Sequence, residues 1–488
     1  MMRPSEPKQP ALFAYQVNLE HRVPADHPLR RIKRVLDLSF VEPAVRHTYG
    51  RTGHPSVPPQ LILRMMFLLF YYNLPSEREL MEQIRLRLDF LWFLDLDLDS
   101  AVPDHSVLSK ARTRWGPEIF ERLFTRTVEQ CVAAGLVNGQ LLHIDSTIVA
   151  ASAAKDSVAS AAPQLIEALR ENYRAQERKL TVLAEPPAPS APPGAAKVND
   201  TRLSTTDPDA RLARDKSGVT RLAYKEHRMV DDARGVITAV ATTLAIQPDG
   251  GQLPVLYAQH QANTGLQLAA PAVAGDRHYG TSDNYRFCLQ AGLRPHLGEA
   301  ANGVKGRGLF EPERFVYEAA ADRFRCPAGN YLMLHQHRPE QQTSTYLIQR
   351  PETCAHCPLR AQCTRAKAGR SLQVPTPFGP MEKARREAHG PAARRSRKRR
   401  QHVMEGSFAQ AANNHGSKRA RWRRLWRQQI QSWLIVAVQN LQILLKETPS
   451  AREPRAAALA IKTGGTTAAN CRSGGRAGWW SARRPQNF

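Results

Sequence analysis

The sequence predicts an α/β protein whose sheet-containing part follows an all-helical N-terminal domain. Between about residues 56 and 135, apolar residues recur at the spacing of amphipathic helices. At residue 140 the pattern changes to a short apolar and β-branched run, 141–149, which is typical of a buried strand. Strand-like and helix-like segments then follow one another, as in an α/β fold.

The helical segment carries start and stop signals. Pro59 predicts a helix start. Ser76 and Glu79 have the spacing of a capping box, in which the serine side chain accepts the backbone N–H three residues later. Short helices with tight turns favour a helix-turn-helix-like DNA-binding bundle, although an ordinary helical bundle has the same pattern.

The α/β part is expected to contain a hairpin that turns at 231–234. The elements expected after the first strand are strands over 222–230, 235–246 and 270–275, and helices over 282–291, 395–415 and 422–445.

The chain is strongly basic. Its 488 residues include 69 Lys and Arg against 44 Asp and Glu, a formal net charge of +25. No apolar run approaches the roughly 20 residues of a membrane span, and the N-terminus lacks the apolar part of a secretory signal. Seven cysteines are too few for a disulfide scaffold. We therefore expect a cytoplasmic, nucleoid-associated protein that binds a polyanion and no membrane.

About half of the net charge lies in one segment. Between Lys383 and Arg427 there are fifteen Lys and Arg residues and two Glu, a net charge of +13. This segment continues into the pattern of an amphipathic helix, so at least part of it is expected to be folded. A solvated face or a disordered tail is the alternative.

Three acids occupy unusual positions. Asp145 lies inside the predicted buried strand, Asp276 ends another strand, and Glu405 lies within the basic segment. A buried carboxylate is costly unless it is paired or bound to a metal. Carboxylate oxygens suit Mg²⁺ or Mn²⁺, and two such ions support phosphoryl transfer. The alternative is that these are ordinary strand-end acids and a salt-bridge partner.

Four cysteines have the pattern C-x27-C-x2-C-x5-C in a segment expected to be rich in loops. They are Cys326, Cys354, Cys357 and Cys363. Four thiolates form a tetrahedral Zn²⁺ site, and a metal would stabilise a segment with little core. Four reduced cysteines without a ligand are the alternative. Cys131, Cys288 and Cys471 are scattered and are expected to be inert.

A series of motifs occurs in a fixed order between about residues 10 and 446. They are PDHS (103–106), RTR (112–114), HIDST (143–147), DPDA (207–210), YKEH (224–227), DRHYG (276–280), EGSFA (405–409), NNHG (413–416) and RARWR (419–423). This series resembles bacterial insertion-sequence transposases of the DDE class, whose catalytic fold is similar to RNase H. The resemblance implies an RNase H-like mixed-sheet catalytic domain in which Asp145, Asp276 and Glu405 bind Mg²⁺ or Mn²⁺, with two ions expected.

The resemblance also implies an organisation and a set of partners. The expected parts are a helical DNA-binding domain over 10–135, a first part of the catalytic core over 138–300 with a Pro-rich loop at 185–197, a Cys-containing insertion over 301–380, a second part of the core over 381–446 and a disordered basic tail over 447–488. The expected partner is double-stranded DNA, as transposon ends and as target, bound by a homo-oligomer.

The DNA contacts are expected from basic residues near the motifs. They are Lys418, Arg419, Arg421, Arg423, Arg112 and Arg114. Related families place Tyr and Arg shortly before the glutamate and Lys after it, whereas this chain has Lys398, Gln401 and Ala412 at those offsets. The expected activity is DNA cleavage and transfer of a 3′-hydroxyl to target DNA. The alternatives are a non-catalytic DNA-binding regulator from a decayed element and an RNase H-like nuclease.

Overall fold

The computed structural model describes residues 17–50, 56–180, 198–214, 218–298, 309–310 and 314–448, without the side chains of 177–180. All of them belong to the first of two compact units, residues 1–448. Several predicted features lie outside the described residues. They are the Pro-rich loop at 185–197, the first residues (10–16) of the helical domain, nearly all of the basic tail, and Cys471. In the part of the chain that is described, no helix has both the length and the apolar character of a membrane span.

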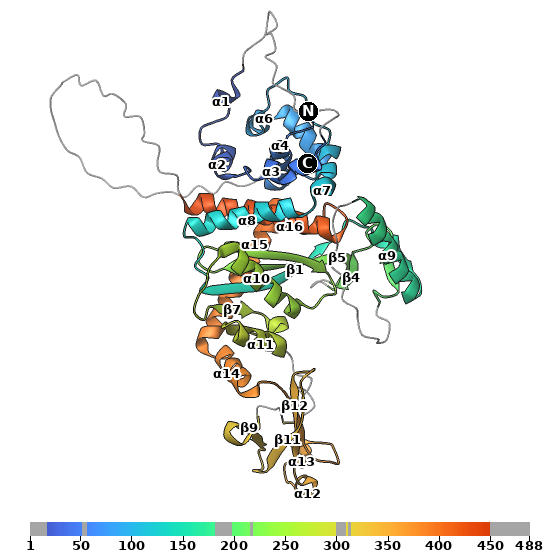
Figure 1. Cartoon of the computed structure of the whole chain (residues 1–488), viewed down its shortest axis with the longest axis vertical. Coiled ribbons are helices and arrows are strands. Elements are labelled where there is room, and N and C mark those ends of the chain that lie inside the picture. Colours follow the sequence, from blue (N-terminus) through green and yellow to red (C-terminus); the bar gives the residue numbers. More distant parts are fainter. Residues whose placement is uncertain are drawn as a thin grey trace, which may run out of the picture. The chain divides into compact units, whose positions relative to one another are not determined.

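Helices provide the regular structure of the described residues before 141 (Figure 1). They are α1 (Leu19–Arg22), α2 (Pro28–Val35), α3 (Val41–Val45), α4 (Pro59–Tyr71), α5 (Glu77–Leu86), α6 (Leu88–Phe93), α7 (Ser106–Trp115) and α8 (Glu118–Ala133). Ser76 accepts the backbone N–H of Glu79 over 3.1 Å, which confirms the predicted cap of α5. Gly116 ends α7 with a φ of +73°, a conformation that favours glycine.

These helices share a hydrophobic core with the C-terminal part of the fold. Phe67 of α4, Phe124 of α8 and Leu434 of α16 (Leu425–Glu447) belong to one buried cluster. α8 and α16 lie side by side (Figure 1). Because the core continues across residue 135, the boundary of a separate helical domain there stays a prediction.

A mixed six-stranded sheet forms the centre of the α/β part. Its strands are β1 (Leu141–Ala150), β4 (Arg211–Arg214), β5 (Thr220–Asp231), β6 (Ile237–Leu244), β7 (Ala272–Gly275) and β8 (Arg294–Leu297). β1 pairs antiparallel with β5, which pairs antiparallel with β4 and β6. On its other side β1 pairs in parallel with β7, which pairs in parallel with β8. The predicted mixed sheet and the hairpin between β5 and β6 are confirmed.

Helices pack against this sheet. They include α10 (Gln252–Thr264), α11 (Ser282–Gln290), α14 (Phe378–Ala388) and α15 (Pro391–His415). α9 (Pro163–Leu180) follows β1 along the chain. α16 packs on β6, and α15 packs on β1, β7 and β8. The helix that carries Glu405 therefore lies against the strands that carry the two aspartates. A two-stranded sheet, β2 (Val158–Ser160) with β3 (Arg202–Ser204), lies outside this arrangement.

The prediction of a loop-rich segment over 301–380 missed a second sheet. The described residues of this segment include a five-stranded antiparallel sheet in the order β13-β12-β11-β10-β9. The strands are β9 (Val316–Glu318), β10 (Arg323–Arg325), β11 (Tyr331–Arg338), β12 (Thr343–Ile348) and β13 (Ser371–Pro375), and two short helices, α12 (Pro351–Ala355) and α13 (Arg360–Cys363), precede β13. Half of β11 is polar and exposed, so it lacks the apolar alternation by which strands are predicted.

Candidate active site

Asp145 and Asp276 belong to neighbouring parallel strands. β1 and β7 pair with Leu141 opposite Ala272 and His143 opposite Ala274. Asp145 lies in β1 and Asp276 directly follows β7, so the same register, continued by two residues, sets them side by side. The structure therefore brings these two predicted site residues together.

The Asp145 carboxylate is held by Arg400 of α15. Arg400 Nη1 donates to Asp145 Oδ2 over 2.6 Å, and the backbone N–H of Ser146 donates to Oδ1 over 2.8 Å. Burial raises the pKa of Asp145 above its ordinary value, Arg400 and the Ser146 N–H oppose this, and the charge of Asp276 raises it further. Arg400 was not predicted as a site residue, and only its position five residues before Glu405 in the basic segment pointed to it.

Asp276 lies at the start of a tight turn. Its Oδ1 accepts the backbone N–H of His278 over 2.8 Å, and its Oδ2 lies 3.1 Å from the Nδ1 of the same residue. The backbone of Gly298, just after β8, packs directly behind this turn. A Cβ at Gly298 would come within 2.6 Å of the Arg277 nitrogen and 2.8 Å of the Asp276 carbonyl carbon. Glycine is therefore needed there for the turn to keep its position.

Glu405 lies on the exposed side of α15. It accepts a hydrogen bond from Gln401 Nε2 over 3.2 Å. Five residues separate it from Arg400, which is about 7.5 Å along a helix axis. Within the described residues, no group of three or more His, Cys, Asp or Glu side chains stands in a metal-binding arrangement. The structure thus brings the two aspartates together, and Glu405 lies on the helix that covers their strands but is not grouped with them.

A buried polar network fixes α15 over the sheet. Arg228 of β5 lies opposite Asp145 in the antiparallel register, so the two side chains share a face. Its guanidinium donates to Glu226 Oε1 over 2.6 Å, to Ser407 Oγ over 3.0 Å and to Gln439 Oε1 over 2.9 Å. All four side chains of the network are buried. Because Ser407 is two residues after Glu405, this network fixes the height of the glutamate above the sheet.

The DPDA motif holds the start of α16. Asp207 accepts the backbone N–H of Arg424, and Asp209 accepts that of Leu425, each over 3.1 Å. The Tyr224 hydroxyl donates to the Asp207 carboxylate, with both oxygens at 2.7 Å. The carboxylates satisfy N–H groups that a helix start leaves unpaired.

Four of the six residues predicted to bind DNA are exposed. They are Lys418, Arg419, Arg423 and Arg114. The first two lie beside the end of β1, where the Ala150 N–H donates to the Lys418 carbonyl over 2.9 Å. Lys418 Nζ also donates to Thr147 Oγ1, two residues after Asp145, over 3.2 Å.

Arg112 and Arg421 require a correction. Arg112 is 3% exposed, forms an ion pair with Glu77 and lies 3.9 Å from the ring centre of Trp422. Arg421 donates to the Leu74 carbonyl and, over 2.9 Å, to Asn73 Oδ1, and burial lowers its pKa to about 10. Both guanidinium groups connect parts of the fold, which favours a structural role over the predicted DNA contacts.

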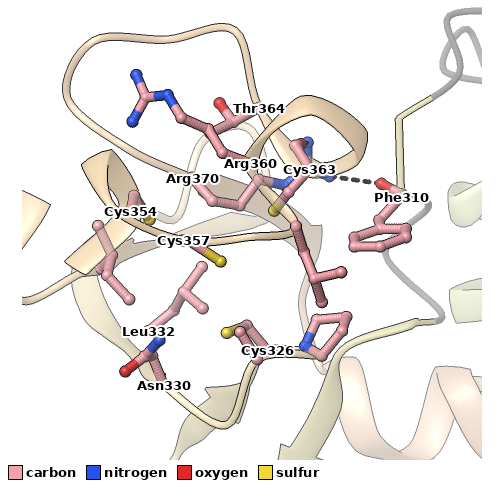
Figure 2. Close-up of a pocket in the computed structure, with 14 residues that line it drawn as sticks. Phe310, Cys326, Asn330, Leu332, Cys354, Cys357, Arg360, Cys363, Thr364 and Arg370 are labelled. Atoms are coloured by element: carbon pink, nitrogen blue, oxygen red, sulfur yellow. Dashed lines mark hydrogen bonds between the residues drawn. The ribbon is translucent and has the colours of Figure 1, made fainter.

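The four cysteines of the predicted zinc site line one small cavity in the second sheet. Figure 2 shows the sulfur atoms of Cys326, Cys357 and Cys363 turned toward its interior, with Cys354 at its edge. The pKa of the Cys363 thiol is raised by burial and, to a lesser extent, by the other three thiols, while Arg370 opposes the rise. The four thiols are therefore close enough to interact electrostatically.

Comparison with protein-family models assigns two regions of the chain. Residues 17–114 match a model described as a transposase domain (DUF772), and residues 325–445 match a transposase DDE domain. No curated protein matches the chain. The DDE domain implies an RNase H-like fold, in agreement with the mixed sheet. The two matches together support an insertion-sequence transposase of the DDE class, as its motifs predicted.

Proposed function

We propose that this transposase binds the ends of its mobile element and catalyses metal-dependent strand cleavage and strand transfer. In this proposal Asp145, Asp276 and Glu405 hold Mg²⁺ or Mn²⁺, with two ions in the working site. The observation that supports it most is the pairing of β1 and β7, which sets Asp145 beside Asp276 under the helix that carries Glu405.

The donor set fits a hard divalent cation. Carboxylate oxygens are the ligands that Mg²⁺ prefers. Burial and the neighbouring Asp276 both raise the pKa of Asp145, so a cation beside this pair would stabilise its charged form. When bound, such ions activate the attacking oxygen and stabilise the leaving oxygen of a phosphodiester.

The chain's own residues must rearrange to complete the site. Arg400 occupies Asp145 Oδ2, so it has to release or share that oxygen. Once released, its guanidinium is positioned to bind a DNA phosphate next to the carboxylates. α15 is fixed at Arg400 and at Ser407, on both sides of Glu405. We therefore propose that Glu405 enters the site by a change of side-chain rotamer and not by movement of the helix.

The exposed cations hold the DNA backbone in this proposal. Lys418 and Arg419 lie at the end of β1, and Arg423 follows them. Phosphate contacts of this kind provide affinity without sequence preference and weaken as salt increases. Residues that read the element ends belong to the helical region matched by the transposase domain, where Arg114 is exposed. The protein acts on paired ends as a homo-oligomer.

The test is Mg²⁺-dependent cleavage of DNA that carries the element's ends. Asp145→Asn, Asp276→Asn and Glu405→Gln are each expected to lower the cleavage rate by at least about a hundredfold, because each removes a proposed ligand charge. DNA binding in a gel-shift assay should remain. Asp283→Asn is the matched control, since Asp283 is an 89% exposed acid on α11. Full cleavage by any one of the three variants removes that residue from the proposed triad.

A non-catalytic DNA-binding regulator is the second candidate. It is favoured by the Arg400–Asp145 ion pair and by the position of Glu405 apart from the aspartates. DNA binding without cleavage in either Mg²⁺ or Mn²⁺ would support it. An RNase H-like nuclease is the third candidate. An assay that supplies a precut end with a free 3′-hydroxyl distinguishes it, because a nuclease does not join this end to target DNA.

A further inference from the structure

We propose that Cys326, Cys354, Cys357 and Cys363 bind one structural Zn²⁺ ion in the second sheet. This site is independent of the proposed carboxylate site. It involves neither the six-stranded sheet nor α15.

The four cysteines come from three places in the chain and meet at one cavity. Cys326 directly follows β10, Cys354 and Cys357 lie in and just after α12, and Cys363 ends α13. Their side chains are partly buried and line a cavity of about 20 Å³ (Figure 2). A space of this size suits one small ion and excludes an organic cofactor.

Tight backbone turns hold the cysteines at this cavity. The Cys326 N–H donates to the Asn330 carbonyl, and the Gly329 N–H donates back to the Cys326 carbonyl, each over 2.8 Å. Gly329 has a φ of +86°, which this turn requires and which favours glycine. Arg360 donates its backbone N–H to the Cys357 carbonyl over 3.0 Å. The chain therefore turns again between Cys357 and the helix that ends at Cys363.

Gly369 leaves space for one of the thiols. A Cβ at this position would lie 3.2 Å from Cys354 Sγ and 2.7 Å from a methyl group of Ile348. Gly369 also has a φ of +84°. The chain therefore packs its backbone directly against the cysteine cluster, as in a site that is closed around a ligand.

The second sheet has little else to stabilise its Cys-containing end. Its core is a small cluster of buried side chains, against which three of the cysteines pack. The buried residues are Phe315, Phe324, Leu332, Tyr346, Ile348, Leu372 and Val374. None of the described cysteines forms a disulfide. Small units with so little core commonly need a metal or disulfides, and four convergent thiols provide for the metal.

The surroundings favour Zn²⁺ over other cations. No acidic side chain is among the described residues that line the cavity, so Mg²⁺ and Ca²⁺ lack carboxylate ligands there, whereas four thiolates suit Zn²⁺. Four thiolates around Zn²⁺ carry a net charge of −2. Arg360 and Arg370 line the same cavity, and Arg370 donates to the Cys363 carbonyl and to the Phe310 carbonyl, each over 3.0 Å. These two cations offset the charge of the proposed site.

The thiols have to close onto the ion. As described, they do not stand in a metal-binding arrangement. Zn–S bonds of about 2.3 Å bring tetrahedral sulfur atoms to about 3.8 Å from one another. All four cysteines lie in turns or at the ends of short helices, where side-chain rotation and small backbone shifts suffice for this closure.

The test is the zinc content of the full-length protein, purified without chelator and measured by plasma mass spectrometry. We expect about one zinc per chain. The double variant Cys354→Ala/Cys357→Ala should contain at least about tenfold less. Cys131→Ala/Cys288→Ala removes the same number of thiols from the two buried cysteines outside the cluster and should keep the metal.

A second measurement on the unaltered protein avoids dependence on the folding of a variant. Titration with a mercurial should release the zinc as four thiols react, and exchange for Co²⁺ should give the absorption of tetrahedral thiolate coordination. The proposal is overturned by wild-type protein with seven free thiols and no zinc, by disulfides among the four cysteines, or by iron and inorganic sulfide in place of zinc.

Discussion

Tyr224→Phe tests whether the DPDA motif fixes the start of α16. The Tyr224 hydroxyl donates to the Asp207 carboxylate at 2.7 Å from both oxygens, and both residues are fully buried. A hydrogen bond to a charged group contributes about 1.5–3 kcal/mol. Among the described residues, the variant leaves Asp207 with one hydrogen-bond donor, the Arg424 N–H at 3.1 Å, so we expect a loss of about 2–3 kcal/mol in the free energy of unfolding. Urea denaturation followed by tryptophan fluorescence measures it.

The pH dependence of this loss gives a second readout. Burial raises the pKa of Asp207, and the Tyr224 hydroxyl lowers it. In Tyr224→Phe the pKa therefore rises further. When the pH falls below the pKa of Asp207 in the folded protein, the carboxyl is neutral in both proteins and the difference in stability should shrink.

The matched control is Tyr279→Phe. Tyr279 is also fully buried, but its hydroxyl has no hydrogen-bond partner among the described residues. Removing it should be neutral or slightly stabilising. The reasoning is refuted if Tyr224→Phe changes the free energy of unfolding by less than about 0.5 kcal/mol, or if the control loses as much.

Four further outcomes are expected. Gly298→Ala should cost about 1–3 kcal/mol in urea denaturation and lower cleavage, because its Cβ meets backbone behind the proposed site; an unchanged protein contradicts the close packing. Arg400→Gln removes an interaction that lowers the pKa of Asp145, so the acid limb of the cleavage–pH profile should move to higher pH. If the limb does not move, it does not report the ionisation of Asp145. The pKa of His260 is lowered to about 4 by burial, so the unfolded chain binds the extra proton and stability falls as the pH drops from about 6.5 to 4, by up to roughly 3 kcal/mol. His260→Gln should flatten this part of the stability–pH curve. If the curve stays equally steep, the pH dependence comes from other groups. Lys418→Ala should weaken DNA binding for all sequences and reduce the salt slope by about one, whereas a sequence-dependent loss indicates base contact.

Local signals and the family were predictable from the sequence. The cap at Ser76 and the hairpin at 231–234 depend on neighbouring residues, and both are confirmed. The order of the motifs gave the family, which the two matched domains confirm.

The missed features depend on contacts between distant segments. Arg400 meets Asp145 from 255 residues away, and no local pattern marks which arginine of a basic run points at the sheet. Arg112 has the appearance of a surface cation in its own helix, and only the position of Glu77 reveals that it is buried. In the second sheet, β11 ends in a run of polar, exposed residues, so periodicity did not reveal it.

Strand transfer tests the central claim most directly. A precut element end with a free 3′-hydroxyl is incubated with supercoiled target DNA, Mg²⁺ and either the wild-type protein or Asp145→Asn. The account predicts joined product with the wild-type protein, none with the variant or with chelator, and equal DNA binding by both proteins. Joining by Asp145→Asn at the wild-type rate would contradict the proposed role of the β1 and β7 carboxylates.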